Sequence, residues 1–221
     1  MEIVVLTGQS WVGELPTTLA RATQHAVPVQ LGRAGLDPLL DPLSGSTRLI
    51  IAGSDADLAA VVLRLMRTER LAELSVGYLP AQPRSAVAAT WGLPVAPDAA
   101  AALASHGEPD LVPLVRDDAG GVLLGRGELR PVRGVIYCDD ELVLRGQADR
   151  LVVTPAQTGV AVRAERVSLL GLRSRTATGR AVQIGCLSAA VTCDGVTRPT
   201  PVTRWTWYRH EVDLRLVRGL P

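Results

Sequence analysis

Two short loops contain the residues that could do chemistry, because each follows an apolar run and opens a helical pattern. Residues 53–57 (GSDAD) come directly after the run RLIIA, and residues 80–85 (PAQPRS) come directly after LSVGYL. The free N–H groups and the dipole of a helix N-terminus attract anions. In open parallel sheets, ligands bind beyond the carboxyl ends of the strands. We therefore expect the two loops to lie together at one sheet edge and to offer an anion site, for example for phosphate.

The polar side chains of these loops also have simpler interpretations. Asp55 could contact a nucleotide or a metal ion, but Asp55 and Ser54 are also residue types that cap helix N-termini. Asp57 is expected in the first helical turn, where the helix dipole favours a carboxylate, so this role is preferred over that of a magnesium ligand. Arg84 could hold a phosphate through two N–H groups, and a solvated surface arginine is the equal alternative.

The first half of the chain alternates between apolar runs and helical patterns, which predicts parallel strands with right-handed crossovers. Strands are predicted at residues 2–7, 27–31, 48–52 and 74–79. Helices are predicted at residues 14–26 and 58–70, with two more that have Pro83 and Pro97 in their first turns, the second ending at Gly107. A loop rich in Gly, Pro and Asp is expected up to Ser46. Residues 1–108 are therefore predicted to form an α/β domain with a parallel sheet.

From about residue 109 the pattern changes to short β-branched runs separated by turn signals. These signals lie at residues 117–121, 138–140 and 193–195, and such spacing is typical of antiparallel hairpins in a sandwich or sheet. Residues 109–221 are therefore predicted to form a β-rich domain. Its last strand, at residues 212–219, could pair with either half of the chain.

Two clusters in the second half could bind ligands. Asp139, Asp140 and Glu141 look like a metal-binding group, but they occupy an expected hairpin tip, where acidic residues are usually solvated. Trp205 and Trp207 would share one face of a strand. Core packing is preferred there over a stacking platform for bases or lipid, because aromatic side chains dominate protein cores.

Composition and charge exclude several functions. A net charge of +1 gives no field that would attract nucleic acid or anionic lipid from a distance. No apolar run approaches the roughly 18–20 residues of a membrane helix, and the N-terminal run lacks the basic flank of a signal peptide. Cys138, Cys186 and Cys193 have no metal-type spacing and are expected to be buried reduced thiols. We therefore expect a cytoplasmic protein with no metal site, no transmembrane segment and no nucleic-acid partner.

All 23 basic residues are arginine, and the sequence contains no Lys, Asn or Phe. A GC-rich coding sequence explains this bias. Its chemical consequence is that the chain has no P-loop lysine, no strand lysine of the protein-kinase type and no Schiff-base lysine. Three large enzyme classes are thereby excluded.

At the two loops the sequence resembles the diacylglycerol kinase family, which is related to the sphingosine kinases and NAD kinases. The family has GGDGT after its third strand and PxGTxNxxA after its fourth, where this chain has GSDAD at residues 53–57 and PAQPRSAVA at residues 80–88. GLP at residues 92–94 and the later segment 180–199, with its turn at Asp194 and Gly195, are also similar to the family. The resemblance implies a kinase-like architecture of two domains, ATP and Mg²⁺ as cofactors, and a lipid or small hydroxyl compound as substrate. The nucleotide-binding positions that it implies are Gly8, Ser10, Gly53, Ser54, Asp55, Asp57, Arg84 and Ser85.

The departures from the family pattern fall at the phosphate-facing positions. Ser54 and Ala56 replace two family glycines, and each Cβ obstructs the close approach of a phosphate to the backbone. Asp57 replaces a threonine, and a carboxylate about 4 Å from a phosphate oxygen is repelled by roughly 4 kcal/mol at an effective dielectric constant of 20. In the second loop Pro83 removes an N–H donor. We therefore expect the chain to carry its own anion where a kinase would hold ATP, and no catalytic base can be assigned.

This combination of a kept motif order and altered phosphate loops favours a nucleotide- or lipid-binding pseudokinase with little or no catalysis. Two alternatives stay open. One is an active ATP-dependent kinase that phosphorylates a hydroxyl group of a lipid or another small molecule. The other is a structural or interaction protein with a vestigial cleft, which could form a homodimer through a sheet edge.

Overall fold

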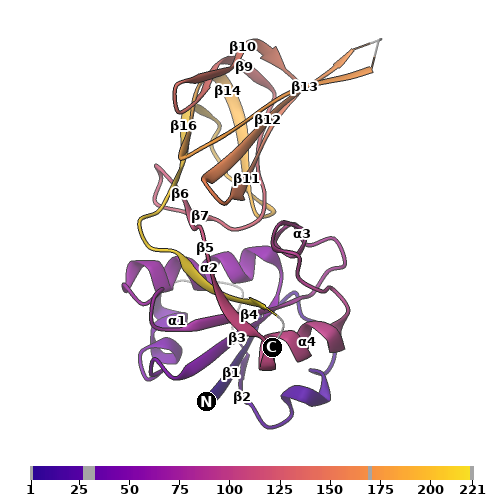
Figure 1. The fold of residues 1–221 in the computed structure, drawn as a ribbon, viewed down its shortest axis with the longest axis vertical. Helices are drawn as coiled ribbons and strands as arrows, with labels where there is room; N and C mark the ends of the chain where they lie inside the picture. Colours follow the sequence, from indigo (N-terminus) through magenta and orange to yellow (C-terminus); the bar gives the residue numbers. More distant parts are fainter. Residues whose placement is uncertain (1, 27–32, 169–170, 220–221) are drawn as a thin grey trace. The chain divides into compact units, whose positions relative to one another are not determined.

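The computed structural model describes residues 2–26, 33–168 and 171–219. The chain divides into two compact units (Figure 1). Met1–Val112 and Val212–Pro221 make up the first unit, and Pro113–Glu211 make up the second.

The first unit is built on one sheet, whose strands have the order β2, β1, β3, β4, β17 and β5 in the part of the chain described. β1 (Glu2–Thr7), β2 (Thr23–Ala26), β3 (Thr47–Gly53) and β4 (Ser75–Pro80) run parallel. Every residue of β3 and β4 is buried, as expected where both faces of a parallel sheet are covered. The predicted α/β class with a parallel sheet is confirmed.

Helices cover the two faces of this sheet. α2 (Asp55–Arg67) buries one stripe of apolar side chains, namely Leu58, Val61, Val62, Leu65 and Met66. α4 (Pro97–His106) packs Ala100, Ala101 and Ala104 into a core cluster with Val5, Ile50 and Leu79 of the strands. α3 (Ala86–Trp91) begins after the Ser85 cap, later than the predicted start at Pro83, and α4 has Pro97 in its first turn and Gly107 at its C-cap, as predicted.

The C-terminal strand β17 (Leu214–Gly219) returns to this sheet between β4 and β5 (Glu108–Val112), seen as the yellow segment in Figure 1. Leu216 pairs with Val76 of β4 in parallel and with Asp110 of β5 in antiparallel. Because β5 pairs with β17, the chain divides after Val112, a little beyond the expected position near residue 109.

Two predictions for the first unit were wrong, and a third lies on residues that are not described. Residues 14–26 do not form one helix: they form a 3₁₀ turn (Thr17–Leu19) and strand β2. The backbone of residues 23–26 pairs with β1 instead, so its polar groups are used in the sheet and not in a helix. The loop expected before Ser46 contains α1 (Arg33–Leu40), since burial of Leu36 and Leu40 outweighs the cost of Pro38 inside it. The strand predicted at residues 27–31 lies outside the described residues.

The second unit is an antiparallel sheet, as predicted. Its strands are β6 (Val115–Asp117), β7 (Val122–Leu123), β8 (Gly127–Arg130), β9 (Val132–Cys138), β10 (Glu141–Ala148), β11 (Arg150–Ala156), β12 (Gly159–Ser168), β13 (Gly171–Gly179), β14 (Ala181–Cys193), β15 (Val196–Thr197) and β16 (Val202–Arg209). The long strand β14 joins the parts of the sheet, because it pairs with β8, β9, β15 and β16.

The two clusters singled out in the second half have structural roles. Trp205 and Trp207 are buried in the core and meet edge to face, with ring centroids 5.9 Å apart. The Asp139 carboxylate accepts hydrogen bonds from the backbone N–H groups of Arg180 and Ala181, each at 2.9 Å. It therefore ties the β9–β10 hairpin to the start of β14.

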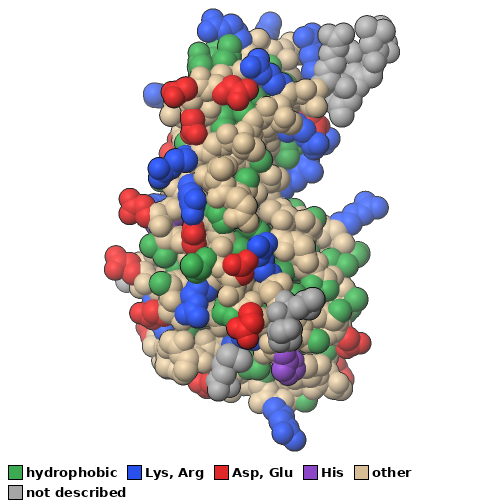
Figure 2. Space-filling view, viewed as in Figure 1, with side chains coloured by type: hydrophobic (Ala, Val, Ile, Leu, Met, Phe, Trp, Pro, Cys, Tyr) green, Lys and Arg blue, Asp and Glu red, His purple; other side chains and the backbone are tan. Residues whose placement is uncertain are grey.

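Within the described residues, no helix has the length and the apolar character needed to cross a membrane. Figure 2 shows basic and acidic side chains interspersed over the face in view, without a large patch of one sign.

Candidate functional site

The turns that follow β1, β3 and β4 meet at one edge of the first sheet, as the sequence predicts for its two loops. The N–H of Gly8, after β1, donates to the carbonyl oxygen of Ala52 in β3 at 2.8 Å. The N–H of Ala81, after β4, donates to the carbonyl oxygen of Gly53 at 2.8 Å. The backbone thus links all three turns, and the side chains discussed below all belong to the first unit.

The Asp57 carboxylate lies at the centre of these turns. Its Oδ2 atom accepts hydrogen bonds from the Ser10 hydroxyl at 2.6 Å and from the hydroxyl and the N–H of Ser54, both at 2.8 Å. In return the Ser54 hydroxyl accepts the N–H of Asp57 at 3.2 Å. Ser54 and Asp57 therefore form a capping box at the start of α2, and Ser10 attaches the β1 turn to it.

Gly8 and Gly53 both lie against the Asp57 carboxylate, which fills the space that a side chain at either position would need. A Cβ atom built on Gly8 would lie 2.4 Å from Asp57 Oδ2, and one built on Gly53 would lie 2.6 Å from the same atom. Real Cβ contacts are never so short, so any side chain at either position would displace the carboxylate. The two glycines that the resemblance assigns to a nucleotide thus enclose an acidic side chain of the protein itself.

Asp55 bridges the two predicted loops. Its Oδ1 atom accepts hydrogen bonds from the hydroxyl groups of Ser85 and Tyr78, and its Oδ2 atom accepts the N–H of Ala86 at 2.7 Å. Ser85 is also the N-cap of α3, because its hydroxyl accepts the N–H of Ala88 at 2.9 Å. The Asp55 carboxylate, from the first turn of α2, therefore occupies the N-terminus of the neighbouring helix α3.

Tyr78 belongs to this network although the sequence did not single it out. Its hydroxyl donates to Asp55 Oδ1 at 2.8 Å, and the side chain is buried in β4. Burial, together with the nearby Asp55 carboxylate, raises the pKa of the Tyr78 hydroxyl above its usual value. The available signal was the position of Tyr78 near the end of the run LSVGYL, on a strand that precedes a predicted loop.

Arg84 is separate from the network. Its side chain is exposed, while Ser85, the next residue, is buried. The structure thus brings together Gly8, Ser10, Gly53, Ser54, Asp55, Asp57 and Ser85, and it leaves Arg84 in solvent at the rim of the second loop.

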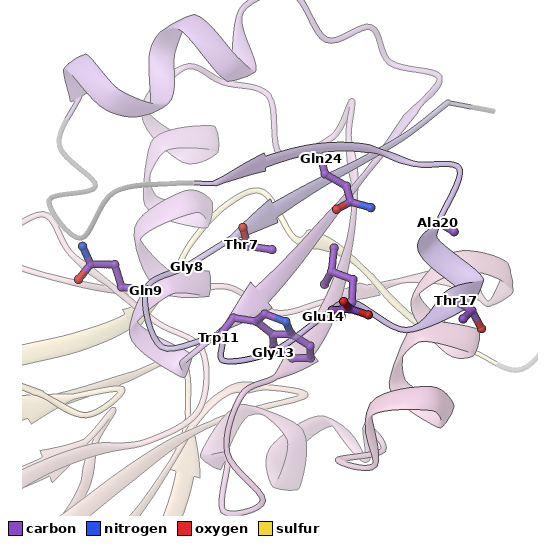
Figure 3. Close-up of a pocket in the computed structure, with 10 residues that line it drawn as sticks. Thr7, Gly8, Gln9, Trp11, Gly13, Glu14, Thr17, Ala20 and Gln24 are labelled. Carbon is purple, nitrogen blue, oxygen red and sulfur yellow. The ribbon is translucent and has the colours of Figure 1, made fainter.

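A cavity of about 990 Å³ opens beside the β1 turn. Figure 3 shows Trp11, Glu14 and Gln24 directed into this hollow and Gln9 directed away from it. The indole Nε1 of Trp11 is buried and has no hydrogen-bond partner among the described residues. The cavity therefore offers an aromatic ring and polar side chains next to the Gly8 turn.

The ATP and Mg²⁺ that the sequence resemblance implies do not fit the two loops as they stand. Asp57 Oδ2 and both oxygens of Asp55 accept hydrogen bonds within the protein, which leaves a cation at most one of the four carboxylate oxygens. The N–H groups of Asp57 and Ala86, which a phosphate at a helix N-terminus would use, are bound by protein side chains. These two N–H groups are thus already paired within the protein.

Known proteins resemble this chain in fold, whereas comparison of sequences finds no match. No protein-family model matches the chain, and no curated protein matches it. A diacylglycerol kinase from Bacillus anthracis str. Sterne has a similar structure, with a TM-score of 0.70, 11% identity, and coverage of 99% of this chain and 97% of that one. An NAD kinase from Archaeoglobus fulgidus, solved with ATP, has a TM-score of 0.56, 11% identity, and coverage of 99% and 94%. Yeast NADH kinase complexed with NADH has a TM-score of 0.52, 9% identity, and coverage of 99% and 84%. The chain therefore has the fold of the diacylglycerol kinase and NAD kinase structures.

Proposed function

We propose that this chain is a nucleotide-binding protein of the diacylglycerol kinase fold that transfers little or no phosphate. The observation that carries the proposal is the Asp57 carboxylate, held by Ser10 and Ser54 in the turn between β3 and α2. In a kinase of this fold, the same turn would have to accept the phosphate tail of ATP, as the sequence resemblance implies.

Two energetic terms oppose a phosphate tail in this turn. Repulsion between a carboxylate and a phosphate oxygen about 4 Å apart costs roughly 4 kcal/mol at an effective dielectric constant of 20. Moving the Asp57 carboxylate away would also break its hydrogen bonds, and a bond to a charged group contributes about 1.5–3 kcal/mol. The sum of the repulsion and the lost hydrogen bonds exceeds the free energy that a phosphate would gain by binding the one or two N–H groups that Asp57 releases.

The cavity beside Gly8 supports binding of the nucleoside part. Its volume of about 990 Å³ is large enough for a drug-sized ligand. The Trp11 ring offers a surface for stacking, and Gln24 offers an amide that can both donate and accept hydrogen bonds. These are groups that recognise a heteroaromatic base without any contact to phosphate.

Calorimetric titration with adenosine, ADP and ATP, each with and without Mg²⁺, tests the proposal. We expect the three affinities to lie within about threefold of one another, or about 0.7 kcal/mol, and to be insensitive to Mg²⁺. Asp57→Ala should raise the affinity for ATP by about tenfold without changing that for adenosine. The matched control is Asp98→Ala, which removes an exposed aspartate from the first turn of α4.

Wild-type protein that binds ATP with Mg²⁺ at least about tenfold more tightly than adenosine would contradict the proposal. So would transfer of radiolabelled phosphate from ATP to a diacylglycerol or another hydroxyl acceptor, which is what the active-kinase alternative predicts. If no nucleotide binds, the proposal of nucleotide binding is wrong, and a structural or interaction role is the remaining alternative.

A further inference from the structure

A second hollow, of about 610 Å³, lies at the opposite edge of the first sheet. Its lining includes Arg48, Ser75, Ser105, Glu108 and Arg215. Arg48 and Ser75 are paired near the starts of β3 and β4, whereas the loops of the candidate site follow the ends of the same strands. Strands of this length span about 20 Å, so the two places are independent.

Arg48 is the most unusual residue of this hollow. Its side chain is only 4% exposed. Nη1 donates to the carbonyl oxygens of Ala104 and Ser105 at the end of α4, at 3.3 and 2.6 Å. Nε is buried without a hydrogen-bond partner, and Arg48 forms no ion pair with any described residue. Burial lowers the pKa of Arg48, and the charge of Glu108 only partly opposes this. A buried arginine without an ion-pair partner is rare, and the carbonyl oxygens at the end of α4 satisfy only the Nη1 group of Arg48.

Ser105 adds a second unsatisfied group to the same hollow. Its side chain is 2% exposed, and its Oγ atom has no hydrogen-bond partner among the described residues. A serine inside a helix normally returns its hydroxyl to a carbonyl of the preceding turn, which Ser105 does not do. Leaving a buried hydroxyl unpaired costs about 1–3 kcal/mol. Two buried donors that lack acceptors therefore line one hollow.

We propose that this hollow binds a small oxyanion, a carboxylate or a phosphate group, through the Nε–Nη2 edge of Arg48 and the hydroxyl of Ser105. That edge of a guanidinium presents two parallel N–H groups, which match two oxygens of either anion. Half-buried Arg215 lines the same hollow and adds positive charge. The exposed Glu108 carboxylate also lines it and disfavours highly charged ligands, so the site favours an anion of low charge.

Nuclear magnetic resonance of the ¹⁵N-labelled full chain tests this site directly, because the Nε–Hε group of a buried arginine gives its own signal. Acetate and inorganic phosphate are titrated separately, so that the two arms distinguish the carboxylate from the phosphate. We expect a saturable shift of the Arg48 Nε–Hε signal and of the Ser105 backbone amide with at least one probe. No saturable shift with either probe at about 50 mM, where a dissociation constant of 1 mM would be saturated, would overturn the proposal.

Variants separate the site from general anion effects. Ser105→Ala leaves the hydrogen bonds of Arg48 to α4 in place and should weaken binding of the effective probe about two- to tenfold. Arg204→Gln, an exposed arginine of the second unit, and Arg84→Gln, at the rim of the candidate nucleotide site, should bind the probe as the wild type does. Unchanged affinity in Ser105→Ala, or weakened affinity in Arg84→Gln, would overturn the assignment.

Discussion

The Asp57 carboxylate fills the space that a side chain on Gly8 would need, since a Cβ at Gly8 would lie 2.4 Å from both Cγ and Oδ2 of Asp57. Gly8 follows the first strand and Asp57 belongs to the first turn of α2, so two distant segments are fitted to each other. The Asp57 carboxylate therefore explains why position 8 is a glycine, and no bound ligand is needed for that explanation.

Gly8→Ala should destabilise the first unit by about 1–3 kcal/mol, because the new methyl group would overpack against the carboxylate. In an Asp57→Ala background the same change should be nearly neutral. Urea unfolding of the four proteins of this double-mutant cycle measures the coupling. Gly45→Ala is the control, since the nearest atom to a Cβ there is 3.9 Å away. An equal cost of Gly8→Ala in both backgrounds would show that the two residues do not compete for space.

Asp55→Ala should cost about 2–3 kcal/mol in the free energy of unfolding, because it leaves the Ala86 N–H without an acceptor and leaves the Tyr78 hydroxyl only the longer bond to the Gly53 carbonyl oxygen. Ser85→Ala should cost about 1 kcal/mol through loss of the α3 cap. The double variant should cost less than the sum, since Ser85 also donates to Asp55. Strict additivity in urea unfolding would mean that the two loops are not held together by this carboxylate.

The strand–turn–helix positions could be predicted from sequence because they follow from local signals. A buried apolar run, a short polar turn and a helical stripe together predicted β3, α2, β4 and their shared edge. What could not be predicted is the partner of each carboxylate. Asp57 is bound by Ser10 and Asp55 by Tyr78, and both pairs depend on which strands are neighbours in the sheet.

The wrong helix at residues 14–26 has a different cause. Leu15, Leu19 and Ala22 do pack together against the core that contains Val5, so the apolar spacing is real. That spacing is produced by a short turn followed by an edge strand, and periodicity alone does not distinguish this from a helix. The return of β17 to the first sheet was likewise open, because a strand at the end of the chain carries no local signal for its partner.

The stability of the second unit should fall at alkaline pH through the thiols of Cys138, which is buried, and Cys193, which like Cys186 is only partly buried, contrary to the expectation of three buried thiols. Burial raises the pKa of Cys138 to about 11 and that of Cys193 to about 12. The folded protein therefore keeps protons that the unfolded chain releases above about pH 9. Stability from this source is complete below pH 9 and is lost as the pH rises toward 11–12.

Urea unfolding of the second unit, followed by tryptophan emission, should show a loss of about 2 kcal/mol or more between pH 8 and pH 10.5. A variant with Cys138→Ala and Cys193→Ala should show a smaller loss over the same range. Cys186→Ala serves as the comparison, because burial raises the pKa of Cys186 less than that of Cys138 or Cys193. A pH dependence that is identical in the double variant and the wild type would assign the effect to other groups.

Trp11 provides the last test, since it lines the cavity that we assign to a nucleoside. Trp91, Trp205 and Trp207 are all buried, so binding of adenosine should change tryptophan emission mainly through Trp11. Trp11→Leu should weaken adenosine binding by about tenfold, because stacking of one base on an aromatic side chain contributes about 1–3 kcal/mol. The neighbouring Val12→Ala is the matched control, as Val12 is 91% exposed and should bind adenosine as the wild type does. If Trp11→Leu binds adenosine as tightly as the wild type in calorimetry, the base lies elsewhere and the cavity is not its site.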